Sequence, residues 1–344
     1  MTVKTKREQF LDYVKNGGDR IPCSPQIGAG AGYEAKLMGK KFGEGTLGDA
    51  MAVANRYNML PLYNVWINAT SHCNPLNTAK GCLGNAGTGI PLTVNGAEDL
   101  GELENILDMA IGEKDMSCYY DLAVSSKELI GEDGPIAFQW GMLPYELLWY
   151  PNTAVNAILP YDDEPYFIRL MEKVLILDYQ MMDALAPSGI EFITLGIPGA
   201  ESVSPRFYDE YIIPYAKKAI DYAHEKGFMI YCHVCGHMEP MLTMGHYNQL
   251  GVDLFETIST PPEGNVVSFA DALGKMDPGI CTRGNVSLSS LLLGTPADIR
   301  KEVYDIMKAA EGRKHFVAAS DYLMYDVPEK NVIAMCEAAE EYYR

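Results

Sequence analysis

Short apolar segments alternate with longer amphipathic segments along most of this chain. The short ones hold about four to seven mostly apolar residues, as buried strands do. The longer ones repeat apolar residues at helical spacing. The predicted strands cover residues 21–27, 63–69, 136–140, 191–195, 228–233, 254–258, 280–284 and 315–319. The predicted helices cover residues 4–16, 46–58, 98–107, 113–129, 165–186, 205–226, 268–273, 297–310 and 329–342.

This alternation of strands and helices predicts a parallel sheet built from βαβ units. No proline- or serine-rich linker separates the units, so we expect one (β/α)8 barrel over residues 1–344 rather than two doubly wound halves. Residues 1–20 are expected to form an amino-terminal helical segment. Residues 72–97, rich in Gly, Asn and Thr, are expected to form a loop or hairpin insertion.

Composition narrows the possible partners. The 344 residues are 48% apolar, enough for a substantial core, and carry a net charge of -19. Nucleic-acid binding needs a clustered basic surface, which is not visible here. No apolar run approaches the roughly 20 residues of a membrane span, and the first residues lack the apolar region of a signal peptide. The eight cysteines are scattered, so we expect a cytoplasmic protein with reduced thiols.

The most informative stretch is residues 227–239, Gly-Phe-Met-Ile-Tyr-Cys-His-Val-Cys-Gly-His-Met-Glu. His233 and Cys235 stand at the carboxyl end of a predicted strand. Side chains two residues apart share one strand face, so an imidazole and a thiol can bind the same ion here. Zinc accepts both ligands and needs one or two more from elsewhere. The alternative is a core histidine beside a small apolar cysteine.

Other polar side chains also fall at predicted strand ends, where the loops of a barrel would bring them together. These are Glu201, Glu256, Cys281, Arg283, Asn285, Ser320 and Asp321. Glu201 and Glu256 are the candidate catalytic carboxylates. Cys281 is either a zinc ligand or a buried structural thiol. Trp66, Trp140, Tyr322 and Tyr325 are candidates for an aromatic slot, although aromatic residues at strand ends are usually core. The candidate substrate pocket consists of Trp66, Trp140, Tyr322 and Asn285.

Taken together, several segments resemble the uroporphyrinogen decarboxylase superfamily. They are residues 77–106, 135–148, 228–242, 282–291 and 317–337. Within that superfamily, His-x-Cys followed much later by Cys marks zinc methyltransferases that work with corrinoid proteins. The true decarboxylases instead carry an amino-terminal arginine-rich segment that holds substrate carboxylates. This chain has Ser24-Pro-Gln-Ile-Gly-Ala-Gly-Ala in that region, so the resemblance favours the methyltransferase branch.

One departure from the methyltransferase pattern concerns the third zinc ligand. Asp321 stands where coenzyme M methyltransferases have a cysteine. The resemblance therefore implies zinc on His233, Cys235 and Asp321. The alternative for Asp321 is a turn cap, in which case Glu201, Glu256 or Cys281 would complete the site. A carboxylate donates less electron density than a thiolate, so this zinc should be the stronger Lewis acid.

A more acidic zinc suits activation of an oxygen in a methyl donor. The expected function is methyl transfer from a small donor, an aryl methyl ether, to the Co(I) of a corrinoid protein. That partner would dock at the carboxyl face of the barrel. Three alternatives stay open: transfer from a corrinoid to a thiol, a uroporphyrinogen-type decarboxylase, and a non-catalytic tetrapyrrole-binding protein. Three protein ligands leave zinc one open position, which favours catalysis over a structural role.

Overall fold

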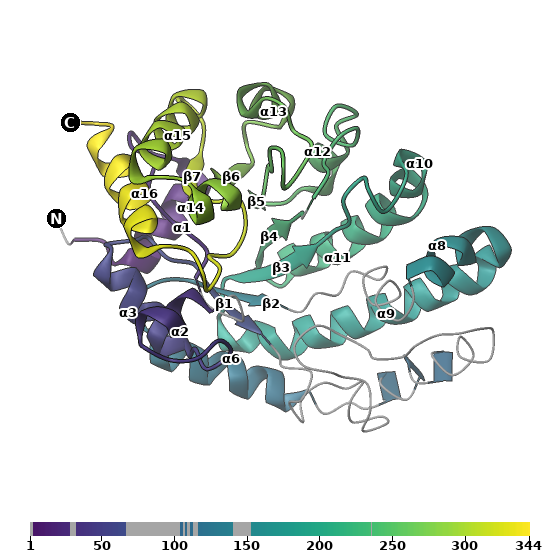
Figure 1. The fold of residues 1–344 in the computed structure, drawn as a ribbon. Helices are drawn as coiled ribbons and strands as arrows, with labels where there is room; N and C mark the ends of the chain where they lie inside the picture. The colour runs from purple at the N-terminus through teal and green to yellow at the C-terminus, as the bar shows by residue number, and fades with distance from the viewer. Residues whose placement is uncertain are drawn as a thin grey trace.

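The structure is a computed structural model that describes residues 3–27, 32–66, 104–105, 107–108, 111–112, 116–139, 153–234 and 236–344. Its centre is a parallel sheet of seven strands that neighbour one another in sequence order. The strands are β1 (Tyr63–Trp66), β2 (Ile136–Gln139), β3 (Phe192–Gly196), β4 (Met229–His233), β5 (Leu254–Glu256), β6 (Cys281–Val286) and β7 (His315–Ala319). In Figure 1 they follow a curved path from β1 and β2, the lowest of the strands in the view, up to β6 and β7, which are the highest.

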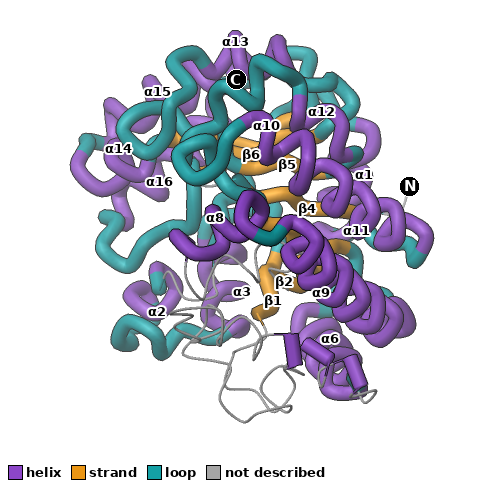
Figure 2. Tube along the Cα trace, turned by 90° about the vertical axis from the view of Figure 1, so that its right-hand side faces the viewer, coloured by secondary structure: helices purple, strands orange, loops and turns teal. Residues whose placement is uncertain are grey.

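Helices cover the convex side of this curved sheet, and α9 and α11 pack against each other there (Figures 1 and 2). The helices are α1 (Lys6–Asn16), α2 (Tyr33–Leu37), α3 (Leu47–Arg56), α6 (Ser117–Ile130), α8 (Thr153–Asp162), α9 (Glu164–Leu185), α10 (Pro205–Phe207), α11 (Ile213–Glu225), α12 (His246–Leu250), α13 (Phe269–Lys275), α14 (Leu288–Leu293), α15 (Pro296–Ala309) and α16 (Glu329–Glu341). A 3₁₀ turn, η1 (Ala186–Ser188), and a π-helical turn, η2 (Tyr208–Ile212), extend them. Among the described residues, no helix has both the length and the apolar character to cross a membrane.

Local sequence explains where several helices begin. Thr5, Thr46 and Thr295 each accept a hydrogen bond from the third helical residue, whose carboxylate bonds back to the threonine amide. This reciprocal capping satisfies amide groups that have no partner inside the helix. The predicted helix 205–226 is helical from Pro205 to Glu225, passing from α10 through η2 into α11. Sequence periodicity missed α2, α8, α12 and α14. In α8, Pro160 lies inside the helix, where a proline normally indicates a break.

The predicted strands from β1 to β7 are confirmed wherever the structure describes them, but the predicted first strand is not. Residues 21–27 are extended and form one isolated parallel bridge, Cys23 with Val317. The backbone bonds of this segment include Ser24 N to Val317 O (2.7 Å), Val317 N to Pro22 O (2.9 Å) and Leu60 N to Cys23 O (3.0 Å). Pro22 and Pro25 lack amide donors, which limits a longer ladder. The segment thus contacts β7 and the residues before β1, while closure into eight strands stays a prediction.

Helix α1 covers the amino-terminal end of the strands. Phe10 is fully buried, stacks on Phe316 with ring centres 4.6 Å apart, and meets Phe192 edge-on at 6.1 Å. It belongs to a buried group that we call the floor cluster. Its members are Phe10, Tyr13, Val14, Leu62, Ala137, Phe192, Tyr231, Leu254, Cys281 and Phe316. Most come from strands, so this cluster identifies the strand face that points to the interior.

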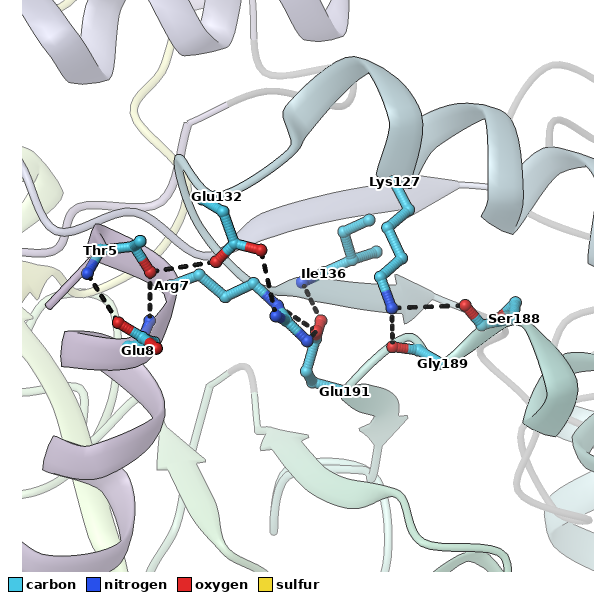
Figure 3. Close-up of polar contacts among 9 residues, drawn as sticks. All are labelled: Thr5, Arg7, Glu8, Lys127, Glu132, Ile136, Ser188, Gly189 and Glu191. Carbon is cyan, nitrogen blue, oxygen red and sulfur yellow. Dashed lines mark hydrogen bonds and ion pairs between the residues drawn. The ribbon is translucent and has the colours of Figure 1, made fainter.

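An ion pair fixes α1 to the sheet at this end (Figure 3). Arg7 Nη2 lies 2.6 Å from Oε1 of Glu191, which directly precedes β3. The other oxygen of Glu191 accepts a hydrogen bond of 2.9 Å from the amide of Ile136, at the start of β2. Glu132 also pairs with Arg7 at 3.4 Å.

That residues 1–344 form a single domain stays a prediction. The predicted insertion at residues 72–97 lies outside the described residues.

Candidate active site

Three side chains stand next to one another on β4, β5 and β6. His233 is in register with Glu256, and Glu256 is in register with Arg283. Each lies two residues after a member of the floor cluster, namely Tyr231, Leu254 and Cys281. Residues two apart share a strand face, so all three side chains point to the interior, on the carboxyl-terminal side of the floor cluster.

The three side chains form a continuous polar chain. His233 Nδ1 lies 3.1 Å from Glu256 Oε1, within hydrogen-bonding distance. Glu256 Oε2 lies 3.3 Å from Arg283 Nη1. Arg283 Nε donates a hydrogen bond of 2.7 Å to the carbonyl oxygen of Ser24, in the extended segment 21–27. The orientation of the imidazole is therefore linked, through two buried ionisable groups, to the backbone beside β7.

Burial dominates the electrostatics of this chain. Glu256 and Arg283 are both fully buried. Burial raises the pKa of Glu256 well above its usual range, and the positive charge of Arg283 acts against that rise. Burial also lowers the pKa of His233, so the imidazole is neutral at pH 7. When Glu256 is ionised beside the guanidinium, Nδ1–H of His233 donates to it. Nε2 then keeps its lone pair, as a metal ligand requires.

Asp321 follows β7 and lies near this chain. Its negative charge raises the pKa of His233, against the effect of burial. It also raises the pKa of Glu256, which places the Asp321 carboxylate within electrostatic range of both groups. One oxygen, Oδ1, accepts a hydrogen bond of 2.7 Å from the amide of Tyr322. Asp321 therefore has a turn-type backbone contact while standing near the imidazole, and its role as a zinc ligand stays a prediction.

Cys235, the second predicted ligand, lies outside the described residues, but its neighbours are described. Gly236 has a φ of +83°, and a Cβ there would collide with the carboxylate of Glu201. Oε2 of Glu201 accepts a hydrogen bond of 2.8 Å from the amide of His237. Glu201, predicted as catalytic, thus supports the backbone of Gly236 and His237, which follow Cys235 in the chain. Whether it also contacts substrate stays a prediction.

The predicted pocket residues are only partly described. Asn285, on β6, is buried, and its Oδ1 has no hydrogen-bond partner among the described residues. The Tyr322 ring centre lies 6.4 Å from that of His233. Trp66 ends β1, but its side chain is not described, and Trp140 lies outside the described residues. The structure therefore brings Tyr322 to the imidazole and leaves the aromatic slot as a prediction.

Cys281 is not at the end of the sheet where a ligand would be needed. It is the first residue of β6, is fully buried and belongs to the floor cluster. Burial raises the pKa of its thiol, which keeps the sulfur protonated. The strand-end position expected from the sequence is wrong, because β6 begins at Cys281 rather than ending near it. The structural interpretation of this thiol therefore fits better than the ligand interpretation.

Sequence reasoning missed the importance of Arg283 and of other interior polar groups. Both terminal nitrogens of Arg283 lack hydrogen-bond partners among the described residues. The same holds for Ser24 Oγ, both side-chain polar atoms of Gln26 and of Asn64, Thr194 Oγ1 and Tyr231 OH. Buried polar atoms normally find a partner in protein, water or ligand. The sequence feature that could have indicated this buried polar group is Arg283 itself, a charged residue two positions after Cys281 in a predicted buried strand.

The side chains at and near His233 include donor types that zinc binds. Among the described residues, which leave out Cys235, no three His, Cys, Asp or Glu side chains form a metal-binding group. His233 nevertheless has the carboxylate contact on Nδ1 that orients metal-binding histidines in other proteins. Asp321 supplies a nearby carboxylate. Imidazole, thiolate and carboxylate are all zinc donors, so the residues fit the metal.

Comparisons with known proteins agree with this architecture. Over its whole length the fold is similar to a methyltransferase from Methanosarcina mazei, with a TM-score of 0.70, 17% identity, and coverage of 99% of this chain and 100% of the other. In sequence, 155 residues are 30% identical to uroporphyrinogen decarboxylase of Prochlorococcus marinus (strain NATL1A). A stretch of 157 residues is 29% identical to the enzyme of Synechococcus sp. (strain CC9605).

Each of these sequence matches covers 44% of this chain and only 41% of the curated relative, so the chain matches about two fifths of that relative's length. The family model for uroporphyrinogen decarboxylase (URO-D) matches residues 157–342, which include His233, Glu256, Arg283 and Asp321. The matched region is more than half of the 344 residues. The chain therefore belongs to the uroporphyrinogen decarboxylase family.

Proposed function

We propose that this protein is a zinc-dependent methyltransferase. It moves a methyl group from a small donor, an aryl methyl ether, to the Co(I) of a corrinoid carried by a partner protein. The observation that carries the proposal is the contact between His233 Nδ1 and the buried carboxylate of Glu256, 3.1 Å apart. It presents the other ring nitrogen for a metal at the carboxyl end of β4. A protein of the same fold from Methanosarcina mazei is a methyltransferase.

In this proposal, His233, Cys235 and Asp321 hold zinc and leave one position open for the donor. Zinc supplies Lewis acidity there, which stabilises negative charge on a leaving oxygen. Glu256 fixes the tautomer and the direction of the His233 ring. Arg283 balances the charge of Glu256 and is itself held by Ser24 O at 2.7 Å. Glu256 and Arg283 thus act as positioning residues.

Features around the residues proposed to hold zinc support an aromatic methyl donor. Tyr322 lies beside His233, with ring centres 6.4 Å apart, and offers a flat apolar surface. Asn285 has a buried amide whose oxygen lacks a partner in the described part of the chain. Trp66 and Trp140 complete the proposed aromatic slot. The partner must approach at the carboxyl ends of the strands, since α1 and the floor cluster fill the other end.

The experiment that tests this function uses purified protein, free Co(I) cobalamin and a panel of methyl donors. Methoxylated aromatic compounds should convert the Co(I) absorption band to that of methyl-cobalt, and methylamines should not. The matched control is His233→Ala, which should give no conversion. If the protein instead demethylates methylcobalamin with a small thiol and ignores aryl ethers, it acts on the acceptor side of such a pathway.

The rival function is decarboxylation, which the names of the matched sequence relatives favour. Those relatives are uroporphyrinogen decarboxylases. In this chain, the segment 21–27 contributes Ser24 and Gln26 rather than arginines. Arg20, which directly precedes this segment, packs over the ring of Tyr343 at 5.5 Å. Carbon dioxide release from uroporphyrinogen, with no methyl transfer in the cobalamin assay, would establish this rival.

A further inference from the structure

Two thiols that are distant in sequence meet outside the candidate active site. Cys23, in the extended segment 21–27, and Cys336, in α16, have sulfur atoms 3.4 Å apart. They are separated by 313 positions in the chain. Cys336 is 6% exposed, while Cys23 is only partly buried. By contrast, the Cys281 sulfur contacts a backbone oxygen, that of Thr282, at 3.9 Å.

A cavity of about 500 Å³ gives access to this thiol pair. It lies between α1, the segment leading into β1, residues 20–23 and α16. Its lining includes Cys23, Cys336, Lys6, Arg20, Tyr57 and Tyr343. A space of this size admits small molecules, because a water molecule occupies only about 30 Å³ in the liquid. The pair is therefore reachable from outside without opening the core.

We propose that Cys23 and Cys336 are a redox modification site that hydrogen peroxide oxidises to a reversible disulfide. In the first step the sulfur of Cys23 attacks one peroxide oxygen, the O–O bond breaks, and Cys23 becomes a sulfenic acid, while the thiol proton of Cys23 joins the leaving hydroxide as water. In the second step the sulfur of Cys336 attacks the sulfenic sulfur. The S–O bond breaks, the S–S bond forms, and the thiol proton leaves with the oxygen as water. Peroxide is the two-electron oxidant, and a dithiol reductant reverses the change.

The geometry suits these steps. A disulfide has a sulfur separation of about 2.05 Å, so side-chain rotation or a small backbone shift has to shorten the distance of 3.4 Å. The order of attack follows from exposure, since Cys23 is the more exposed of the two residues. The hydrogen bond with Cys23 and burial both raise the pKa of Cys336. Cys336 therefore stays a thiol and acts as the second, resolving cysteine.

Oxidation at this position would act on the segment that supports the candidate active site. Cys23 directly precedes Ser24, whose carbonyl oxygen accepts the hydrogen bond from Arg283. Bonding Cys23 to α16 would fix this segment against the last helix. The proposal does not depend on methyl transfer, because the oxidation can be read from the protein itself.

The test uses the full chain, reduced with dithiothreitol, freed of reductant and treated with hydrogen peroxide. Free thiols are then alkylated, the protein is digested, and the peptides are identified by mass spectrometry. We expect a peptide pair joined through Cys23 and Cys336 that disappears when dithiothreitol is added back. Cys23→Ala and Cys336→Ala should each abolish it, whereas Cys281→Ala should retain it. Glutathione disulfide in a parallel sample shows whether a disulfide oxidant reaches the same pair.

If a variant does not fold, the wild-type protein by itself still tests the proposed disulfide. Its melting temperature should rise by several degrees on oxidation and return on reduction, because the bond closes a very long loop. Alkylation of both Cys23 and Cys336 after a peroxide dose that oxidises other cysteines would overturn the proposal. Sulfinic acid at Cys23 with a free thiol at Cys336 would overturn it as well.

Discussion

His233 and Glu256 stand in register on neighbouring strands, and the buried carboxylate of Glu256 lies 3.1 Å from Nδ1 of the imidazole. A histidine held in this way has one fixed ring orientation. The second ring nitrogen is then available to a ligand, and its direction is set by β4 and β5 rather than by a loop. Such a carboxylate partner commonly strengthens metal binding by its histidine.

Replacing either of the first two proposed ligands should remove zinc. The isolated protein should carry about one zinc ion per chain. His233→Ala and Cys235→Ala should each lose it, while circular dichroism shows an unchanged fold. His237→Ala is the matched control, because His237 is an exposed histidine only two residues after Cys235. Full zinc content in both ligand variants, measured by elemental analysis, would rule out this site.

Asp321→Ala should lower zinc affinity and methyl transfer together, because it removes a charged donor near His233. Asp321→Cys should keep zinc but transfer methyl groups from ethers more slowly, since a thiolate makes zinc a weaker Lewis acid. Asp326→Ala, which changes an exposed carboxylate in the same loop, should have neither effect. Asp321→Ala with unchanged zinc and activity would transfer the ligand role to another carboxylate, Glu201 or Glu256.

Glu256→Gln should weaken zinc binding by roughly 10- to 100-fold, because an amide is a poorer acceptor for the Nδ1 proton of His233. Glu256→Ala should in addition destabilise the protein by about 3–5 kcal/mol, since it leaves the buried charge of Arg283 without a partner. Isothermal titration and urea unfolding measure the two effects. The control is Glu191→Gln, a buried carboxylate paired with Arg7 at the other end of the sheet, which should leave zinc affinity unchanged. Equal affinities in Glu256→Gln and wild type would contradict the positioning role.

His315 should make the protein less stable in acid. It is fully buried on β7, with Nδ1 2.9 Å from the hydroxyl of Thr282, and burial lowers its pKa to about 3. The unfolded chain binds a proton near pH 6.5, so this contribution is fully present above that pH and is lost as the pH falls towards 3. Between pH 7 and pH 5 the loss amounts to roughly 2 kcal/mol.

Urea unfolding at both pH values measures this effect. The pH-dependent loss of stability should be smaller by that amount in His315→Gln than in wild type. Comparing the two pH values within each protein separates the titration of His315 from any constant destabilisation by the glutamine. An identical loss in wild type and variant would show that His315 does not contribute.

The sequence predicted those parts of the fold that depend on local periodicity. The position of His233 at a strand end followed from the apolar residues before it, and the helices around it followed from their spacing. Cys281 was misplaced although the predicted strand, 280–284, began within one residue of β6, because a residue at the start of the strand was assigned to its carboxyl end. The link from His233 to Arg283 could not be predicted, since it depends on the register of three strands. Registers are set by packing between segments far apart in the chain.

The contacts of residues 22–24 with Val317 also bear on how the chain acquires its structure. The Ser24 amide and the Pro22 carbonyl find their backbone partner only on β7, almost 300 positions later. During synthesis on the ribosome, these hydrogen bonds cannot form until β7 has been made. Such non-local pairing slows folding and prolongs exposure to aggregation. The final step of folding should therefore be the meeting of these two distant segments, which makes chaperone dependence greatest late in translation.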